Sequence, residues 1–438
     1  MSSEWPLVVV EDVCELIVDC VNKTAPIVEE PTPYRMIRTT NVRNGRIDLS
    51  TCRYVVQETY EKWTRRARLQ PGDVILTREA PIGEVGFVNE SEGVFLGQRL
   101  MQYRADSKHL DPRFLLYSFL SPALQHQFRS HEGSGSVVSH IRVGDCFKFK
   151  MRLPPLAIQQ EIAALLGALD ERIALLRETN ATLEAIAQAL FKSWFVDFDP
   201  VHARARGEQP AGLAPEVAAL FPDSFEESDL GMVPKGWSLS PLSEAYEINP
   251  TRKLKKGEIA PYLDMASVAT SGHTVAGVAD REMGSGTKFI NGDTLLARIT
   301  PCLENGKTAF VDFLAQEQTG WGSTEFVVLR PKAPLPTYHG YLLARHPAFR
   351  EHAIQSMSGT SGRQRVQNDV LGRYLVTVPS EKVAMAFNDV ISPLQQKITE
   401  NHRQAQPLVN LRDTLLPRLI SGQLRLPHAE PQLKDLAV

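Results

Sequence analysis

Apolar residues follow a helical spacing in two separate parts of the sequence. In the first part, after Pro154 and Pro155, they step alternately by four and three positions, with one polar interruption at Asn180. The series is Ile162, Leu166, Leu169, Ile173, Leu176, Asn180, Leu183, Ala187, Leu190 and Trp194. Such a narrow stripe is typical of a coiled-coil seam, and prolines favour a helix start. We therefore predict a long helix over residues 154–199.

A second stripe predicts a partner for this helix. It begins at Phe387, 225 residues after Ile162, and consists of Phe387, Ile391, Leu394, Ile398, Asn401, Ala405, Leu408, Arg412, Leu415 and Leu419. A helix that only covered its own domain would not need so narrow a seam. Because buried polar groups seek hydrogen bonds, we expect antiparallel packing with Asn180 near Asn401. Pro393 and Pro407 should kink or break the second helix.

The segments that precede the two helices resemble each other. Residues 69–88, "LQPGDVILTREAPIGEVGFV", and 289–311, "FINGDTLLARITPCLENGKTAFV", share an apolar residue, Gly-Asp, a strand, a turn and a second strand. Gly72 and Gly292 lie 220 residues apart. This period is too long for a solenoid and indicates duplicated domains. Each copy combines short β-like segments with helical patches over 112–128 and 338–354.

The predicted fold class is α+β, with two mixed α/β domains separated by two long antiparallel coiled-coil-like helices in a pseudo-twofold tandem repeat. At 1.5 Å per residue, each helix would span roughly 60 Å. The predicted bounds are 1–153 for the first domain, 154–199 for the first helix, 200–233 for a linker with one short helix, 234–378 for the second domain, 379–425 for the second helix and 426–438 for a tail.

Charge is unevenly distributed along the chain, whose formal net charge is -3. Residues 35–68 carry nine Arg or Lys and three acids, so a phosphate-binding face and an ordinary solvated basic face both remain open. Residues 154–199 carry seven acids and three bases, which suits a protein contact better than a nucleic-acid contact. Residues 380–425 carry six bases and four acids, which complements them.

Composition argues against a membrane or secreted protein. No apolar run reaches the roughly 18 residues that span a bilayer, and the N-terminus lacks the features of a signal peptide. The five cysteines are scattered without a CxxC pair, which indicates neither a disulfide framework nor a zinc site. We therefore expect a cytoplasmic protein.

The sequence contains no complete catalytic motif. The segment "NGKT" (305–308) lacks the first glycine of a phosphate-binding loop, because Pro301 occupies that position. The only Pro-Pro pair, in "LPPLA", starts a helix and is not the Asn/Asp-Pro-Pro-aromatic signature of an adenine methyltransferase. The eleven histidines form no HExxH or HxH, so metal ligation is unsupported.

Polar loops beside strands offer candidates for DNA contact. Segments 97–104, 134–142, 322–330 and 358–369 place Gln, Arg, Asn, Ser and Thr among glycines at matching places in both halves. Such side chains form base contacts, while Arg and Lys hold phosphates. The candidate DNA-binding residues are Arg38, Arg43, Arg78, Gln98, Arg99, Ser134, Arg142, Lys253, Arg298, Asn305, Lys307, Ser323, Thr324, Thr360, Arg363, Gln364 and Arg365.

The chain resembles the specificity subunit of a type I restriction-modification system over nearly its whole length. The resemblance is carried by "LPPLAIQQEIAALLGALDERI", "LFKSWFVDFDPV", "LGMVPKGWSLSPLSE", "STEFVVLRP" and "LRDTLLPRLISGQL", specific as an ordered set. It implies two target-recognition domains, 1–153 and 234–378, that each read half of a bipartite DNA site. It also implies that the two helices pair antiparallel as a spacer.

The resemblance further implies a non-catalytic chain that acts with partners. The expected partners are double-stranded DNA, two methylation subunits and restriction subunits. No contact with a membrane is expected. No cofactor is expected in this chain, whereas S-adenosylmethionine, ATP and Mg are expected in the partner subunits. Departures from the family pattern are Pro393, Pro407 and the balanced charge of residues 235–330, with ten bases and eleven acids.

The stretch "ALFKSWFVDFDPV" (189–201) ends the first helix. Trp194 continues the seam, whereas Phe195 and Phe198 do not, so their rings need another surface, on the next domain or a methylation subunit. We expect Asn180, Trp194, Phe195, Phe198 and Asn401 to make spacer or partner contacts. The alternative functions are a solitary DNA-modifying nuclease or methyltransferase with an unrecognised site, and a coiled-coil scaffold that does not bind DNA.

Overall fold

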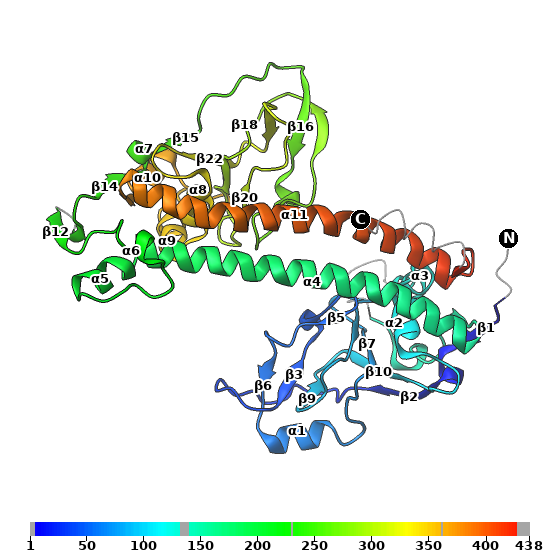
Figure 1. The fold of residues 1–438 in the computed structure, drawn as a ribbon. Helices are drawn as coiled ribbons and strands as arrows, with labels where there is room; N and C mark the ends of the chain where they lie inside the picture. The colour runs from blue at the N-terminus through cyan, green and yellow to red at the C-terminus, as the bar shows by residue number, and fades with distance from the viewer. Residues whose placement is uncertain (1–4, 132–139, 229–230, 361, 427–438) are drawn as a thin grey trace. The chain divides into compact units, whose positions relative to one another are not determined.

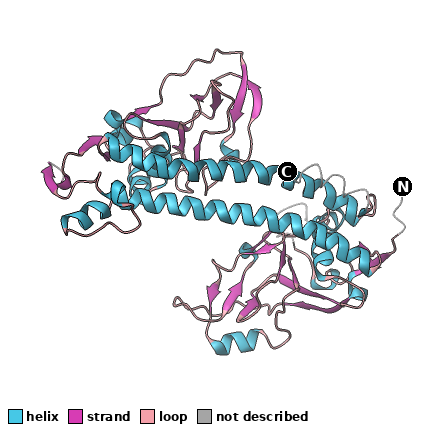
Figure 2. Ribbon diagram, viewed as in Figure 1, coloured by secondary structure: helices cyan, strands magenta, loops and turns pink. Residues whose placement is uncertain are grey.

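The computed structural model describes residues 5–131, 140–228, 231–360 and 362–426. The chain divides into two units, the first comprising residues 1–174 and 406–438 and the second residues 175–405. Both units mix strands with helices (Figure 2). Two long helices, α4 (Leu156–Phe195) and α11 (Glu381–Ile420), contribute residues to both units (Figure 1). Within the described part of the chain, no helix is long and apolar enough to cross a membrane.

An antiparallel sheet of order β2-β10-β7-β8 forms the centre of the first unit. Its strands are β2 (Cys14–Asp19), β7 (Val74–Thr77), β8 (Val85–Phe87) and β10 (Leu100–Ala105). A second sheet of order β6-β3-β9 pairs its last two strands in parallel. The remaining strands pair as β1 with β11 and β4 with β5. These strands are β1 (Leu7–Val9), β3 (Arg35–Ile37), β4 (Val42–Arg43), β5 (Arg46–Ile47), β6 (Arg53–Tyr54), β9 (Val94–Leu96) and β11 (Lys150–Arg152).

The second unit repeats this arrangement. Its central sheet has the order β15-β22-β19-β20, which matches β2-β10-β7-β8 strand for strand. A second sheet, β17-β16-β21-β18, again contains one parallel pair, β16 with β21. The strands are β14 (Ser238–Pro241), β15 (Tyr246–Ile248), β16 (Ile259–Leu263), β17 (Ala279–Glu282), β18 (Thr287–Phe289), β19 (Thr294–Ala297), β20 (Thr308–Phe310), β21 (Gly320–Gly322), β22 (Phe326–Pro331) and β23 (Leu375–Val378). The predicted tandem repeat is confirmed.

Each predicted helical patch consists of two short helices. Ser121 and His346, with ψ of 150° and 134°, separate them, and each precedes a proline that disfavours the helical conformation. The pairs are α2 (Pro112–Leu120) with α3 (Pro122–Arg129), and α8 (Thr337–Arg345) with α9 (Pro347–Gln355). The other short helices are α1 (Gln57–Trp63), α5 (Asp199–Ala205), α6 (Pro215–Ala218), α7 (Leu242–Ala245) and α10 (Asn368–Gly372).

The repeated Gly-Asp pair has a structural role in both units. Gly72 and Gly292 adopt positive φ angles of +96° and +86°, a conformation that favours glycine. The following aspartates are fully buried and accept backbone amides: Asp73 from Gln70 (2.7 Å) and Asp293 from Ile290 (2.9 Å). Arginines complete each site, with Arg104 on Asp73, and Arg252 and Arg330 on Asp293. These contacts explain why the pair marks the repeat in sequence.

The two long helices pack antiparallel in each unit. In the first unit, Leu166 near the start of α4 shares a core with Leu415 and Leu419 near the end of α11. In the second unit, Trp194 at the end of α4 lies 5.3 Å, between ring centroids, from Phe387 at the start of α11. The predicted antiparallel pairing is therefore confirmed, and the apolar seam positions are buried or half-buried.

Asn180 and Asn401 meet within the seam of the second unit, as expected. Asn401 Nδ2 donates to Asn180 Oδ1 at 2.9 Å, and Asn180 Nδ2 donates to the carbonyl oxygen of Ile398 at 3.0 Å. Asn401 is only 2% exposed. The two amides thus satisfy each other where water has little access.

Of the two effects expected of Pro393 and Pro407, a kink or a break of the second helix, the break is wrong. α11 continues from Glu381 to Ile420 through both Pro393 and Pro407. Both prolines lie on the exposed face of the helix, and so do Asp389 and Arg403, whose carbonyl groups lose their amide partners. Solvent can hydrate those carbonyls, so each proline costs less here than it would in a buried turn.

The segment over 200–233 contains more structure than the predicted linker with one short helix. It forms α5 and α6, and its end pairs β12 (Phe225–Ser228) with β13 (Gly231–Pro234) as an antiparallel hairpin. Strands of four residues without apolar alternation leave little trace in sequence, which explains why this strand pair was not expected.

The Asn180–Asn401 pair predicts a non-additive effect on stability. Replacing either residue by alanine should lower the free energy of unfolding by roughly 1–3 kcal/mol, because the other amide stays in the seam without its partner. The double Asn180→Leu/Asn401→Leu variant should lose less than the sum of the two alanine variants. Denaturant unfolding followed by circular dichroism measures this, with exposed Gln396→Ala as the control. Equal, additive losses would contradict the pairing.

Candidate nucleic-acid interface

In the first unit, Arg78 joins three segments at the end of β7. Its backbone amide donates to the carbonyl of Arg99 (2.8 Å), and its own carbonyl accepts from the amide of Ile141 (3.0 Å). Its side chain, in a residue only 8% exposed, donates from Nη1 to the carbonyl of Ile141 (3.1 Å). Arg78 therefore holds together the segments that carry the candidate residues Gln98, Arg99 and Arg142.

The second unit forms the same junction from matching residues. The amide of Arg298 donates to the carbonyl of Glu325 (2.9 Å), and the amide of Val366 donates to the carbonyl of Arg298 (3.0 Å). Gln364 adds a further link, because its carbonyl accepts from the amide of Thr300 (3.1 Å). The structure thus brings Arg298, the turn over residues 323–325 and residues 364–366 to one place, which sequence spacing alone did not show.

Carboxylates pair with the arginines at each junction. Arg99 Nε lies 3.1 Å from Glu79 Oε2 in the first unit. In the second unit, Arg365 contacts both oxygens of Glu325 at 2.6–3.0 Å, and this fork lowers the pKa of Glu325 below its ordinary value. The carboxylates were missed because no spacing rule links residues that are twenty (Glu79 and Arg99) or forty (Glu325 and Arg365) positions apart. They orient the arginines and neutralise part of their charge.

The remaining candidate residues differ in their hydrogen bonds within the protein and in their exposure to solvent. Arg38 donates to the carbonyl of Thr51 (3.0 Å), Arg43 to that of Val42 (2.9 Å), and Lys307 to that of Met265 (2.7 Å). Gln98, Arg298, Ser323, Gln364 and Arg365 are half-buried, whereas Arg99, Arg142, Lys253, Asn305, Thr324, Thr360 and Arg363 are exposed. Ser134 lies outside the described residues.

The loop between β19 and β20 rests on two arginines that sequence reasoning did not select. Arg345 Nη1 donates to the carbonyl of Gly306 (2.8 Å), and Arg350 Nη2 donates to that of Glu304 (3.1 Å). These contacts fix the backbone on both sides of exposed Asn305. Lys253 lies apart in the chain, between β15 and β16.

The aromatic residues that end α4 pack against the start of α11 and the domain that follows. Phe195 meets Phe387 edge-on, with ring centroids 4.7 Å apart, and also lies against Trp237 and His339. Phe198 meets Trp237 edge-on at 5.9 Å. Burial lowers the pKa of His339 to about 3, so this ring is neutral within the aromatic cluster. Of the two surfaces considered for these rings, the neighbouring domain provides one, and a partner contact stays a prediction.

No group of three or more His, Cys, Asp or Glu side chains that could hold a metal occurs among the described residues. The site offers arginines, amides and hydroxyls beside strand ends. These groups can bind phosphates and base edges, as expected of a DNA-binding surface.

Comparisons with known proteins show similarity to type I restriction specificity subunits. Residues 2–185 match the family described as type I restriction modification DNA specificity domain. The chain is 22% identical over 403 residues to the HindI type I restriction enzyme specificity subunit of Haemophilus influenzae. The matched region covers 81% of this chain and 87% of the HindI subunit. It is 24% identical over 368 residues to the MjaIX specificity subunit of Methanocaldococcus jannaschii, with 81% and 78% covered.

A solved structure has a similar fold. The chain is similar to the crystal structure of a type I restriction-modification system S subunit from M. genitalium, with a TM-score of 0.53, 15% identity and 95% and 96% of the two chains covered. Together, the family, the curated relatives and this fold support a DNA sequence specificity subunit of a type I restriction-modification system. The HindI and MjaIX relatives are named specificity subunits, and specificity subunits of type I systems are non-catalytic.

Proposed function

We propose that this chain reads a bipartite DNA target and holds the methylation and restriction subunits of its system. The observation that carries the proposal is the duplicated junction, at which Arg78 and Arg298 occupy equivalent places in two units of the same topology. Two copies of one reading surface suit a target with two half-sites. The family assignment supports the rest of the proposal.

The two copies present different side chains at the same structural position. Gln98 and Arg99 precede β10, whereas Thr324 and Glu325 precede β22, its counterpart. Because base recognition depends on the donors and acceptors presented to the groove, these surfaces should read different bases. We therefore take residues 1–153 and 234–378 as two target-recognition domains, and the long helices as the spacer between the half-sites.

The exposed candidates are the best choice for direct DNA contact. Arg99, Arg142 and Arg363 have charge available at the surface, whereas buried Arg78 is held by Ile141 and acts as a support. Arg43, Lys253, Asn305, Thr324 and Thr360 belong with the exposed group. Arg38, Gln98, Arg298, Lys307, Ser323, Gln364 and Arg365 would act from partly buried positions, and Ser134 stays a sequence-based candidate.

Catalysis would belong to the partner subunits. Two methylation subunits would bring S-adenosylmethionine, and restriction subunits would bring ATP and Mg. The family assignment supports this division of labour. The non-seam faces of α4 and α11 are the surfaces we propose for the methylation subunits.

The exposure of Arg142 predicts a purely electrostatic defect. Arg142→Ala should weaken DNA binding by the complex formed with the methylation subunits and reduce the slope of log affinity against log salt by about 1, as expected for one lost phosphate contact. Fluorescence anisotropy titrations at several salt concentrations measure this. Exposed Arg206→Ala, outside the candidate set, is the matched control. An unchanged slope with normal affinity would exclude Arg142 from the interface.

The modular interpretation is tested by exchanging one domain. Replacing residues 1–150 with the corresponding domain of a relative that has a different target should change one half-site and leave the other half-site and the gap intact. Single-molecule methylome sequencing of cells that express the chimera with its methylation subunit measures both. The modular interpretation would be wrong if both half-sites changed together.

A further inference from the structure

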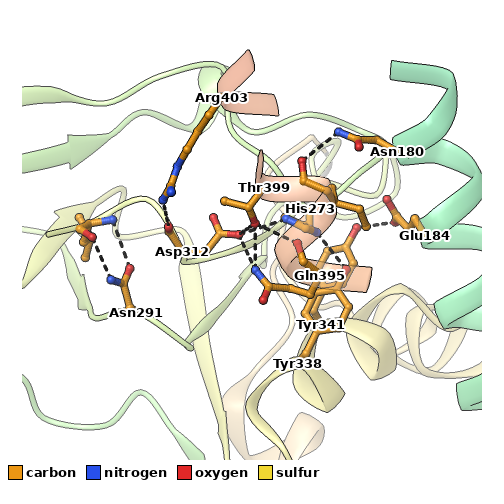
Figure 3. Close-up of polar contacts among 12 residues, drawn as sticks. Asn180, Glu184, His273, Asn291, Asp312, Tyr338, Tyr341, Gln395, Thr399 and Arg403 are labelled. Carbon is orange, nitrogen blue, oxygen red and sulfur yellow. Dashed lines mark hydrogen bonds and ion pairs between the residues drawn. The ribbon is translucent and has the colours of Figure 1, made fainter. Parts of the chain in front are cut away.

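A chain of partly buried polar side chains connects the strand domain of the second unit to α11 (Figure 3). Asp312, which follows β20, has a side chain only 14% exposed. Its Oδ2 accepts from Thr399 Oγ1 (2.5 Å) and from Gln395 Nε2 (2.8 Å). Its backbone carbonyl accepts from Arg403 Nη2 (3.2 Å). One residue of the domain therefore binds three residues of the helix.

These three residues form a separate face of α11. Gln395, Thr399 and Arg403 follow one another at intervals of four, which places them on one side of the helix. The seam toward α4 uses Ile398 and Asn401, each about 100° or more around the helix axis from Thr399. α11 thus presents one face to the partner helix and another to Asp312.

The same polar chain continues to α4. His273, fully buried, has Nε2 3.2 Å from Asp312 Oδ2 and Nδ1 2.9 Å from the hydroxyl of Tyr338. The rings of Tyr338 and Tyr341 stack with centroids 5.2 Å apart. Tyr341 donates its hydroxyl to Glu184 Oε1 on α4 (2.5 Å). The domain is therefore tied to both helices through one connected set of residues.

The chemistry of this network favours a single orientation. Apolar packing is tolerant of small rotations, whereas hydrogen bonds weaken steeply when their geometry changes. Burial raises the pKa of Asp312. The contacts with His273, Thr399 and Gln395 together lower the pKa by more than burial raises it, so it lies below the ordinary value. Asp312 is thus a buried carboxylate, and a rotation that removed its donors would leave an unsatisfied charge.

The first unit also joins a tyrosine hydroxyl to a carboxylate of α4, but its link to α11 is different. There, Asp170 of α4 accepts from the hydroxyl of Tyr117 (2.9 Å) and from Arg412 of α11 (2.8 Å). The central carboxylate thus belongs to a helix in the first unit and to the domain in the second. The Asp312 network is a feature of the second unit and not part of the shared repeat.

We infer that Asp312 and Thr399 are positioning residues that fix the second recognition domain on the helix pair, and thereby the gap at which the second half-site is read. This inference rests on the proposed function. Neither residue needs to touch DNA, because a rotation of the domain about α11 would displace its whole reading surface. Loss of the contact should therefore relax the gap and leave the bases unchanged.

The test compares two nearly isosteric changes at one position. Thr399→Val removes the hydroxyl and keeps the branched shape, while Thr399→Ser keeps the hydroxyl. Methylome sequencing of cells carrying the complete system should show that Thr399→Val increases methylation at sites with a gap one base pair longer or shorter by roughly tenfold, as expected for one charged hydrogen bond. Thr399→Ser should retain the wild-type gap.

Asp312→Asn provides a second variant and should relax the gap in the same way. Asp280→Asn, on an exposed residue of β17, is its matched control and should behave as wild type. Circular dichroism of each purified chain checks folding. If the folded Thr399→Val and Asp312→Asn variants methylated only sites with the wild-type gap, the inference would be overturned and the proposed function would stand. A change in the bases read in the second half-site would have the same consequence. Absence of sequence-specific methylation in the wild type would reject the proposed function as well.

Discussion

The narrow seam between α4 and α11 is the constraint on which the rest of the structure depends. Each fully buried leucine or isoleucine contributes roughly 1.5–3 kcal/mol, and the seam repeats such residues from Ile162 to Trp194 and from Phe387 to Leu419. Because the seam occupies only one face, other faces remain free to hold domains. Asp170 and Glu184 on α4, and Thr399 on α11, use those faces. The helices therefore pair and anchor the domains simultaneously.

The two units solve the same packing problem with different residues. Buried Asp73 and Asp293 stabilise equivalent turns, and Arg78 and Arg298 join equivalent strand ends. Each domain donates a tyrosine hydroxyl to α4, from Tyr117 to Asp170 and from Tyr341 to Glu184, whereas the Asp312 contact with Thr399 of α11 belongs to the second unit. Shared contacts preserve the fold, and the differing ones allow each domain its own surface and setting.

The elements with regular spacing were predictable from the sequence. The seam positions, the Asn180–Asn401 contact and the duplicated β7–β8 and β19–β20 strands follow from periodicity and from the Gly-Asp repeat. The β12–β13 hairpin was missed because its short strands lack apolar alternation. α11 continues through Pro393 because exposure at that turn reduces the cost of the lost hydrogen bond, which spacing alone does not reveal.

The candidate site was only partly predictable, because its side-chain pairs depend on the tertiary fold. Polar loops could be selected by composition, yet the pairing of Arg365 with Glu325 and of Arg99 with Glu79 depends on tertiary contacts between distant strands. The position of Asp312 against α11 likewise joins residues 87 positions apart. Which arginines are free to meet a phosphate is therefore decided by folding.

The central claim, that this chain gives sequence specificity to catalytic partners and has no catalysis of its own, is tested most directly by reconstitution. Purified methylation subunits are incubated with labelled S-adenosylmethionine and target DNA, with and without this chain, and the chain is also assayed alone. We expect methylation at the target only when both components are present. Methyl transfer or DNA cleavage by the chain alone, or the same target methylation in its absence, would contradict it.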